Sequence, residues 1–132
     1  MKYMLLMNTT DIGHPPITEW DPVDVKAHIE FMREFTEGLV TSGEFVSGAG
    51  LAMPDEARIV TARDGAAPAV TDGPFPESKE FLAGYWIVDC DGLDRAFEIA
   101  AEASASPGPG GITLNHPIEV REVMSAPPVG DM

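Results

Sequence analysis

Two segments of the chain are apolar at consecutive positions, Tyr3–Met7 and Phe81–Val88. Successive side chains of a β-strand point to opposite faces of the sheet. Each segment therefore predicts a strand whose two faces are both apolar and both buried. In the second segment Tyr85 falls on one face and Trp86 on the other. A fold built around these strands needs a covering layer on each side of its sheet.

Apolar residues recur at helical spacing in two other segments. The first helix is expected to begin after Asp21, which suits the N-cap, with Pro22 at the first helical position. Its expected terminator is Gly43, which follows Ser42. A second helix is predicted at Leu93–Ser104, with Asp91 as its cap.

Shorter strands are predicted in the rest of the chain. One contains Gly48 and Gly50, which leave little side chain and permit a bulge or a close backbone approach. A hairpin turn is predicted at Arg63-Asp64-Gly65. The predicted strands are Glu44–Leu51, Ala57–Ala62, Pro68–Thr71 and Ile118–Met124.

The order of these elements predicts an α+β fold of the ferredoxin-like, split βαβ type, an antiparallel sheet with two helices on one face. Two helices cover one face only, and monomers tolerate exposed apolar patches of only a few hundred Å². We therefore expect a homodimer that packs sheet against sheet and depends on whichever of Tyr85 and Trp86 faces the second chain. Residues 1–124 should form one domain, followed by a frayed tail at 125–132.

The chain is strongly acidic, with 8 basic and 22 acidic residues and a formal net charge of −14. Such a surface repels phosphate groups, so we expect no direct binding to nucleic acid or to anionic membranes. The lone cysteine, Cys90, excludes an internal disulfide and suits a cytoplasmic protein. His14, His28 and His116 are scattered without ligand spacing, so neither a metal site nor a cofactor is predicted.

Three segments resemble the YCII-related family, specifically its DGPF subgroup. They are the opening Met1–Leu6, the stretch Val70–Phe75 with the Lys79-Glu80 and Gly84-Tyr85 pairs after it, and the strand Ile118–Val123. Glu122 stands where the subgroup's closing strand usually has proline. The resemblance implies a ferredoxin-like α+β fold that forms a dimeric α/β barrel. It implies no well-established reaction, although a histidine–aspartate pair has been suggested as catalytic in the narrower YCII branch, and the resemblance implies that His28 matches that histidine.

Two residues are candidate catalytic groups. Asp72 sits in a rigid turn before the long strand, where a carboxylate could serve as a general base or could simply cap the turn. His28 lies near the apolar face of the first helix, where it could act in acid–base chemistry or pack as a neutral core residue.

Four residues are candidate ligand-binding groups. Arg121 and Glu119 share one face of the last strand, where an arginine could bind a carboxylate or phosphate, or could protect an edge strand by charge. Lys79 and Glu80 follow the turn and could equally be solvated corner charges. We further predict that Asp72 and Arg121 belong to one ligand site.

Two functions are compatible with these features. The first is a small-molecule enzyme or binding protein, with a pocket between the sheet and the loops Asn8–Trp20 and Ser106–Pro117. The second is a non-catalytic accessory or regulatory protein that acts through its acidic surface. The DGPF resemblance links this second hypothesis to sigma-factor systems.

Overall fold

The computed structural model describes residues 1–10, 17–73 and 80–124. Three short 3-10 turns connect longer elements in this part of the chain. The two helices are α1 (Pro22–Ser42) and α2 (Leu93–Ser104). The strands are β1 (Lys2–Thr10), β2 (Phe45–Gly50), β3 (Arg58–Arg63), β4 (Ala66–Asp72), β5 (Glu80–Asp89) and β6 (Ile118–Glu122).

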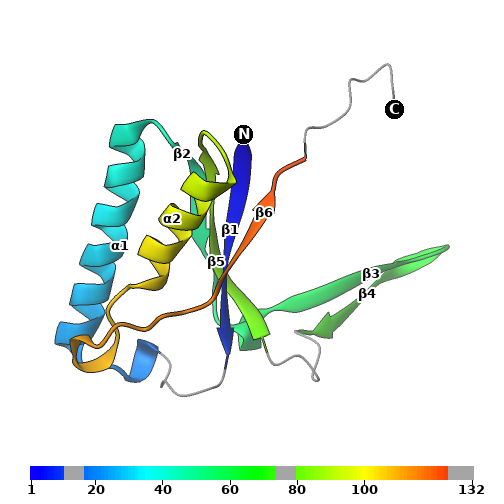
Figure 1. Cartoon of the computed structure of the whole chain (residues 1–132). Coiled ribbons are helices and arrows are strands. Elements are labelled where there is room, and N and C mark those ends of the chain that lie inside the picture. Colours follow the sequence, from blue (N-terminus) through cyan, green and yellow to red (C-terminus); the bar gives the residue numbers. More distant parts are fainter. Residues whose placement is uncertain (11–16, 74–79, 125–132) are drawn as a thin grey trace.

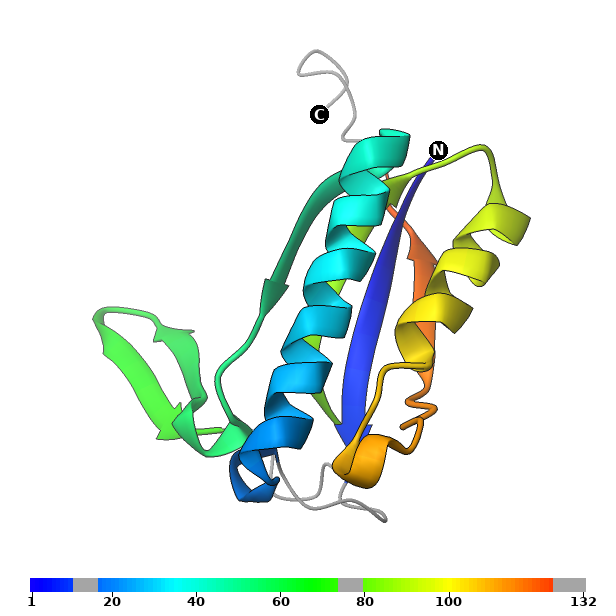
Figure 2. The same ribbon diagram turned by 90° about the vertical axis from the view of Figure 1, so that its left-hand side faces the viewer.

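Four of the strands form an antiparallel sheet in the order β2-β5-β1-β6. Both helices lie on one face of this sheet (Figures 1 and 2). The arrangement confirms the predicted α+β, split βαβ fold. The strands β3 and β4 pair only with each other, as a separate two-stranded sheet. The sequence pattern had predicted this hairpin but not its separation from the main sheet.

The core fills the space between the sheet and the two helices. Leu5 on β1 and Val88 on β5 are fully buried there, and the Trp86 ring packs edge to face on Phe35 of α1 at a centroid distance of 5.3 Å. The buried residues of α2 are mostly small, and small side chains allow a close approach of that helix to the sheet. They are Ala96, Ile99, Ala100 and Ala103.

The opposite face of the four-stranded sheet carries Met4, Leu6, Tyr85 and Ile87, and we call it the open face. Met4 pairs with Ile87 and Leu6 with Tyr85 in register, and all four side chains are half-buried. In the described residues no helix covers them (Figure 1). The two-sided apolar pattern of β1 and β5 thus corresponds to one covered face and one uncovered face.

The ends of α1 agree with the sequence analysis, whereas the start of α2 does not. Pro22 opens α1, and Gly43 ends it in the left-handed conformation with φ 83°. Asp21 occupies the N-cap position of α1, although its side chain forms no capping hydrogen bond. The expected cap of α2 was wrong, because Gly92 and not Asp91 occupies that position.

The first strand is longer than its apolar segment. The pattern predicted a strand over Tyr3–Met7 and a loop from Asn8, but β1 continues to Thr10, which pairs with Glu80 at the start of β5. A register irregularity separates Met7 from Asn8. Pairing with a long neighbouring strand therefore overrides the polar character of these last residues.

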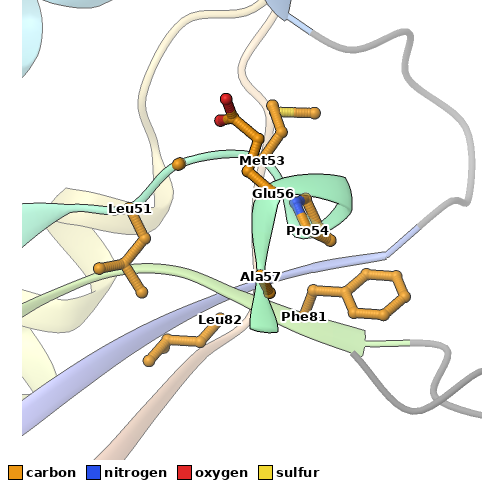
Figure 3. Close-up of a pocket in the computed structure, with 8 residues that line it drawn as sticks. Leu51, Met53, Pro54, Glu56, Ala57, Phe81 and Leu82 are labelled. Atoms are coloured by element: carbon orange, nitrogen blue, oxygen red, sulfur yellow. The ribbon is translucent and has the colours of Figure 1, made fainter. Parts of the chain in front are cut away.

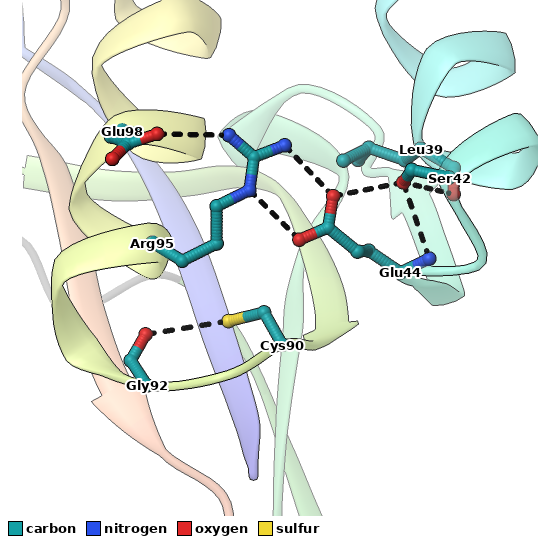
Figure 4. Close-up of polar contacts among 7 residues, drawn as sticks. All are labelled: Leu39, Ser42, Glu44, Cys90, Gly92, Arg95 and Glu98. Atoms are coloured by element: carbon teal, nitrogen blue, oxygen red, sulfur yellow. Dashed lines mark hydrogen bonds and ion pairs between the residues drawn. The ribbon is translucent and has the colours of Figure 1, made fainter.

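An ion pair joins the start of β2 to α2. The Arg95 guanidinium donates two hydrogen bonds of 2.8 Å to the two carboxylate oxygens of Glu44 (Figure 4). The Ser42 hydroxyl, at the end of α1, donates a hydrogen bond of 2.8 Å to Glu44 Oε1. The Glu44 carboxylate is thus held both by α2 and by the end of α1. The Arg95 hydrogen bond is the main cause that lowers the pKa of Glu44 from its ordinary value of 4.5.

Replacing Glu44 with glutamine should lower the free energy of unfolding by about 1 kcal/mol at pH 7. Hydrogen bonds to charged groups contribute about 1.5–3 kcal/mol, but Arg95 is 38% exposed, and solvent screening of exposed ion pairs reduces the expected loss below that range. Because folding lowers the pKa of Glu44, its contribution is present above pH 4.5 and is lost as the pH falls through the lower folded value. Urea unfolding at fixed protein concentration should show the difference between the two proteins shrinking as the pH is lowered below 4.5. A constant difference across this range contradicts the assignment.

Candidate functional site

A cavity of about 380 Å³ lies between α1 and the strands β2 and β5, and we call it the His28 cavity. Helix α1 contributes His28, Met32 and Thr36 to its wall. These residues are four positions apart, and such residues lie on one face of a helix. The volume is at the lower end of the range for small-molecule sites, about 300–1,000 Å³.

Glycines on the two strands make room for the cavity. A side chain at Gly84 would come within 2.9 Å of the Ala49 carbonyl oxygen, so this glycine is needed where β2 and β5 approach closely. A side chain at Gly50 would meet nothing within 4 Å. Gly50 pairs in register with Gly84 on the helix side of the sheet, so an added side chain there would enter the cavity.

His28 is the one imidazole in the cavity wall among the described residues. Its Nδ1 lies 3.0 Å from the carbonyl oxygen of Pro107. A carbonyl oxygen can only accept, so Nδ1 carries the hydrogen and donates it. In the neutral ring Nε2 is then the nitrogen with a free lone pair. The Trp20 ring contacts the imidazole edge to face at a centroid distance of 5.5 Å.

A second bond ties the same helix face to the loop that contains Pro107. The Asp24 carboxylate, one turn before His28, accepts a hydrogen bond of 3.1 Å from the Gly110 backbone N–H. His28 therefore has a structural task as well, because it helps to hold the 106–117 loop on α1. Any test of His28 as a ligand-binding group has to preserve the bond to Pro107.

The described residues that line the His28 cavity carry no formal charge when His28 is neutral. The lining is mostly apolar and includes Met7, Met32, Phe45 and Trp86. Burial of an ionised ligand without an opposite charge is costly. The cavity therefore favours a neutral, largely apolar molecule with a single hydrogen-bonding group near His28.

A second cavity, also about 380 Å³, lies where β2 leads into the β3–β4 hairpin (Figure 3). Its lining is again mostly apolar, with Leu51, Met53, Phe81 and Leu82. Glu56 is the ionisable residue among those described, and its carboxylate points away from Phe81 and Leu82 (Figure 3). The carboxylate is thus not directed at the apolar side chains that form this wall of the cavity, and the His28 cavity is the stronger candidate.

Asp72 lies at the end of β4, on the projecting hairpin. Its side chain is 93% exposed, and Oδ1 lies 3.5 Å from Nε of Arg58 on the paired strand. In a single chain Asp72 is thus on a different sheet from β6, which carries Arg121. The structure of one chain does not bring Asp72, Arg121 and His28 together.

Arg121 and Glu119 extend from the open face, on the side of the sheet away from His28. They pair in register with Met4 and Leu6 of β1, and both are exposed. Glu80 is the first residue of β5, and Lys79 lies outside the described residues. The four ligand-binding candidates are therefore separated from the His28 cavity or lie beyond the part that can be placed.

His28 was predicted from the sequence, but the other parts of this cavity were not. The predicted pocket lay between the sheet and two loops, whereas the His28 cavity lies under α1, although His28 contacts Trp20 and Pro107 of those loops. Gly48 and Gly50 were predicted to permit a bulge or a close backbone approach, and a close approach is found at Gly48 but not at Gly50. That glycine pattern opposite an amphipathic helix is the signal from which a cavity could have been expected.

Two kinds of feature are absent from the described residues. No group of three or more His, Cys, Asp or Glu side chains there is arranged to hold a metal ion. No helix in that part of the chain has the length and apolar character needed to cross a membrane.

Comparison with known proteins places the chain in a family. An uncharacterized protein of Rhizobium meliloti is 48% identical over 42 residues, which make up 31% of this chain and 34% of that protein. The match thus spans about a third of that relative's length. The family model described as the YCII-related domain matches residues 1–110. Because this match extends over most of the sequence, the chain belongs to the YCII-related family.

Proposed function

We propose that this protein is a homodimeric small-molecule-binding protein whose ligand occupies the His28 cavity. The observation that carries the proposal is a mostly apolar space of about 380 Å³ with one imidazole in its wall. Pockets of this kind, with few polar groups among apolar ones, are typical of small-molecule sites. The expected ligand is neutral and largely apolar, because the described lining offers no charged partner.

His28 is the proposed acid–base group of this site. The bond to Pro107 holds the hydrogen on Nδ1, which leaves Nε2 to accept a hydrogen bond or a proton from the ligand. Whether proton transfer leads to a reaction depends on the ligand. Asp72 and Arg121, which were predicted from the sequence, could join the site only through a second chain, because one chain keeps β4 and β6 in different sheets.

The proposed dimer forms through the open face. Its four apolar side chains are only half-buried in one chain, and a second copy packed on them would complete their burial. Such an interface is isologous, with the same surface on each partner. A second chain on the open face explains why β1 and β5 are apolar on both faces although the helices cover only one of them.

The test is a thermal-shift screen with small neutral compounds that carry an apolar ring and one hydrogen-bond donor. A compound present at 100 times its dissociation constant should stabilise the protein by about 2.7 kcal/mol. His28→Asn keeps an amide donor for the Pro107 carbonyl but removes the group that corresponds to Nε2. This variant should stay folded and bind the same compound at least about tenfold more weakly.

A second variant fills the cavity without touching His28. Gly50→Val adds a side chain where nothing lies within 4 Å, so the fold should be retained while binding is lost. The proposal is wrong if no compound stabilises the wild-type protein. It is also wrong if both variants bind the same compound as tightly as the wild type does.

The net charge of −14 favours one alternative, a non-catalytic accessory protein that acts through an acidic surface, as in a sigma-factor system. Its partner would be a basic protein. The two functions differ in their salt dependence, because contacts between exposed charges weaken at high ionic strength and apolar ligand binding does not. An empty ligand screen together with salt-sensitive binding of a basic partner would favour the alternative.

A further inference from the structure

The β3–β4 hairpin, residues 58–72, projects from the body of the protein, and we call it the arm (Figures 1 and 2). Its two strands pair only with each other. Nearly all its residues are exposed, with Ile59 and Ala69 as the exceptions. An isolated two-stranded hairpin is at best marginally stable in water. The arm therefore lacks the packing that usually holds such a hairpin in place.

One face of the arm carries an unpartnered apolar pair. Val60 and Val70 pair directly in register, and their exposed fractions are 63% and 62%. Ile59 points to the other face and lies against the base of the arm, where a side chain added at Gly73 would meet it at 3.0 Å. The base is thus packed, while the valine pair further out stays mostly exposed, with no described element packed on it.

The charge of the arm differs from that of the whole protein. It carries two arginines and two aspartates, so its net charge is zero, and the rest of the chain carries the net charge of −14. Two acidic surfaces repel each other. A neutral arm with Arg58 and Arg63 can approach an acidic copy of the same chain without that repulsion.

The direction of the arm points to its partner. Figure 1 shows the helices on one side of the sheet and the arm on the other side, which is that of the open face. Figure 2 shows the arm beyond the β2 edge of the sheet. A second copy packed on the open face would lie beside the arm, so the valine pair and the open face can belong to one continuous interface.

We propose that the arm packs Val60 and Val70 against the second copy of the chain in the dimer. This inference rests on the proposed dimer through the open face, and it adds a second contact to that dimer. The partner is another copy of this chain because the arm extends on the side where such a copy would be. Each chain holds the other with its arm, so the contact occurs twice in a symmetric dimer.

Hydrogen exchange compares the arm in the dimer with the arm in a monomer. The open-face variant Ile87→Glu supplies the monomer, and the amides of α2 serve as the internal reference. Amides of β3 and β4 should exchange at least tenfold more slowly in the wild-type dimer than in the monomer. If the wild type is a dimer and the arm amides exchange at the same rate in both proteins, the arm contact is wrong and the dimer is not. If the wild type is a monomer at roughly 10 μM, both the arm contact and the proposed dimer are wrong. Neither result affects the ligand screen, which tests the His28 cavity separately.

A pair of double variants tests the valines without weakening the strands. Threonine has a similar shape and also favours strands, so Val60→Thr/Val70→Thr should leave the arm folded. The dissociation constant of the dimer should rise at least tenfold, because four apolar contacts per dimer are replaced. The control is Val23→Thr/Val40→Thr on α1, whose valines are 71% and 59% exposed. An unchanged dissociation constant for the arm variant, or equal changes for both, overturns the inference.

Discussion

Replacing Ile87 with glutamate should convert the protein from a dimer to a monomer. Ile87 lies on the open face between Met4 of β1 and Ser47 of β2. In a dimer the substitution would bury one unpaired carboxylate from each chain, at a cost of several kcal/mol per ion. Since each 1.4 kcal/mol is a tenfold change in a dissociation constant, the dimer should weaken by at least about a hundredfold.

Light scattering at roughly 10 μM measures this change. The wild type should have twice the chain mass and the variant the mass of one chain. The control is Ile29→Glu, because Ile29 is 51% exposed on α1, on the opposite side of the sheet. That protein should remain a dimer. Circular dichroism checks that Ile87→Glu is folded, and a folded variant that is still dimeric contradicts the open-face interface.

Leu5→Ala should lower the free energy of unfolding by about 2–5 kcal/mol, the range for a leucine removed from a packed core. Leu5 is fully buried, with Trp86 and Val120 beside it in register. The loss comes from the reduced apolar burial and from the cavity that the smaller side chain leaves. A value below about 1 kcal/mol would show that the helix side of the sheet is not the core.

The neighbouring residue provides a matched control. Leu6→Ala removes the same atoms from the open face, where the side chain is half-buried in one chain. Both substitutions should be measured by urea unfolding in the Ile87→Glu background, which removes the second chain. Leu5→Ala should then be clearly the more damaging of the two. Equal losses contradict the assignment of faces.

Much of the fold follows from local signals in the sequence. The start and end of α1 were predicted because Pro22 and Gly43 suit those two positions and few others. The span Leu93–Ser104 was also predicted, from its helical spacing, although the predicted cap at Asp91 was wrong. The extension of β1 to Thr10 was not, because it depends on pairing with residues near position 80 that are far away in the sequence.

The candidate site was only partly predictable for a related reason. His28 could be placed on the apolar side of α1, but its neighbours depend on how the helix lies over the sheet. The cavity arises because Gly50 and Gly84 are opposite each other beneath that helix. Separation of Asp72 from Arg121 depends on the hairpin leaving the main sheet, and no local pattern in the sequence marks this departure.

The ring nitrogens of His28 give the most direct test of the proposed function. They can be followed by ¹⁵N NMR while a compound that stabilises the protein is added. We expect the Nε2 signal to shift in proportion to the bound fraction, while Nδ1 keeps the hydrogen that it donates to Pro107. Saturation with both nitrogen signals unchanged would show that the ligand binds elsewhere, and the His28 cavity would not be the site.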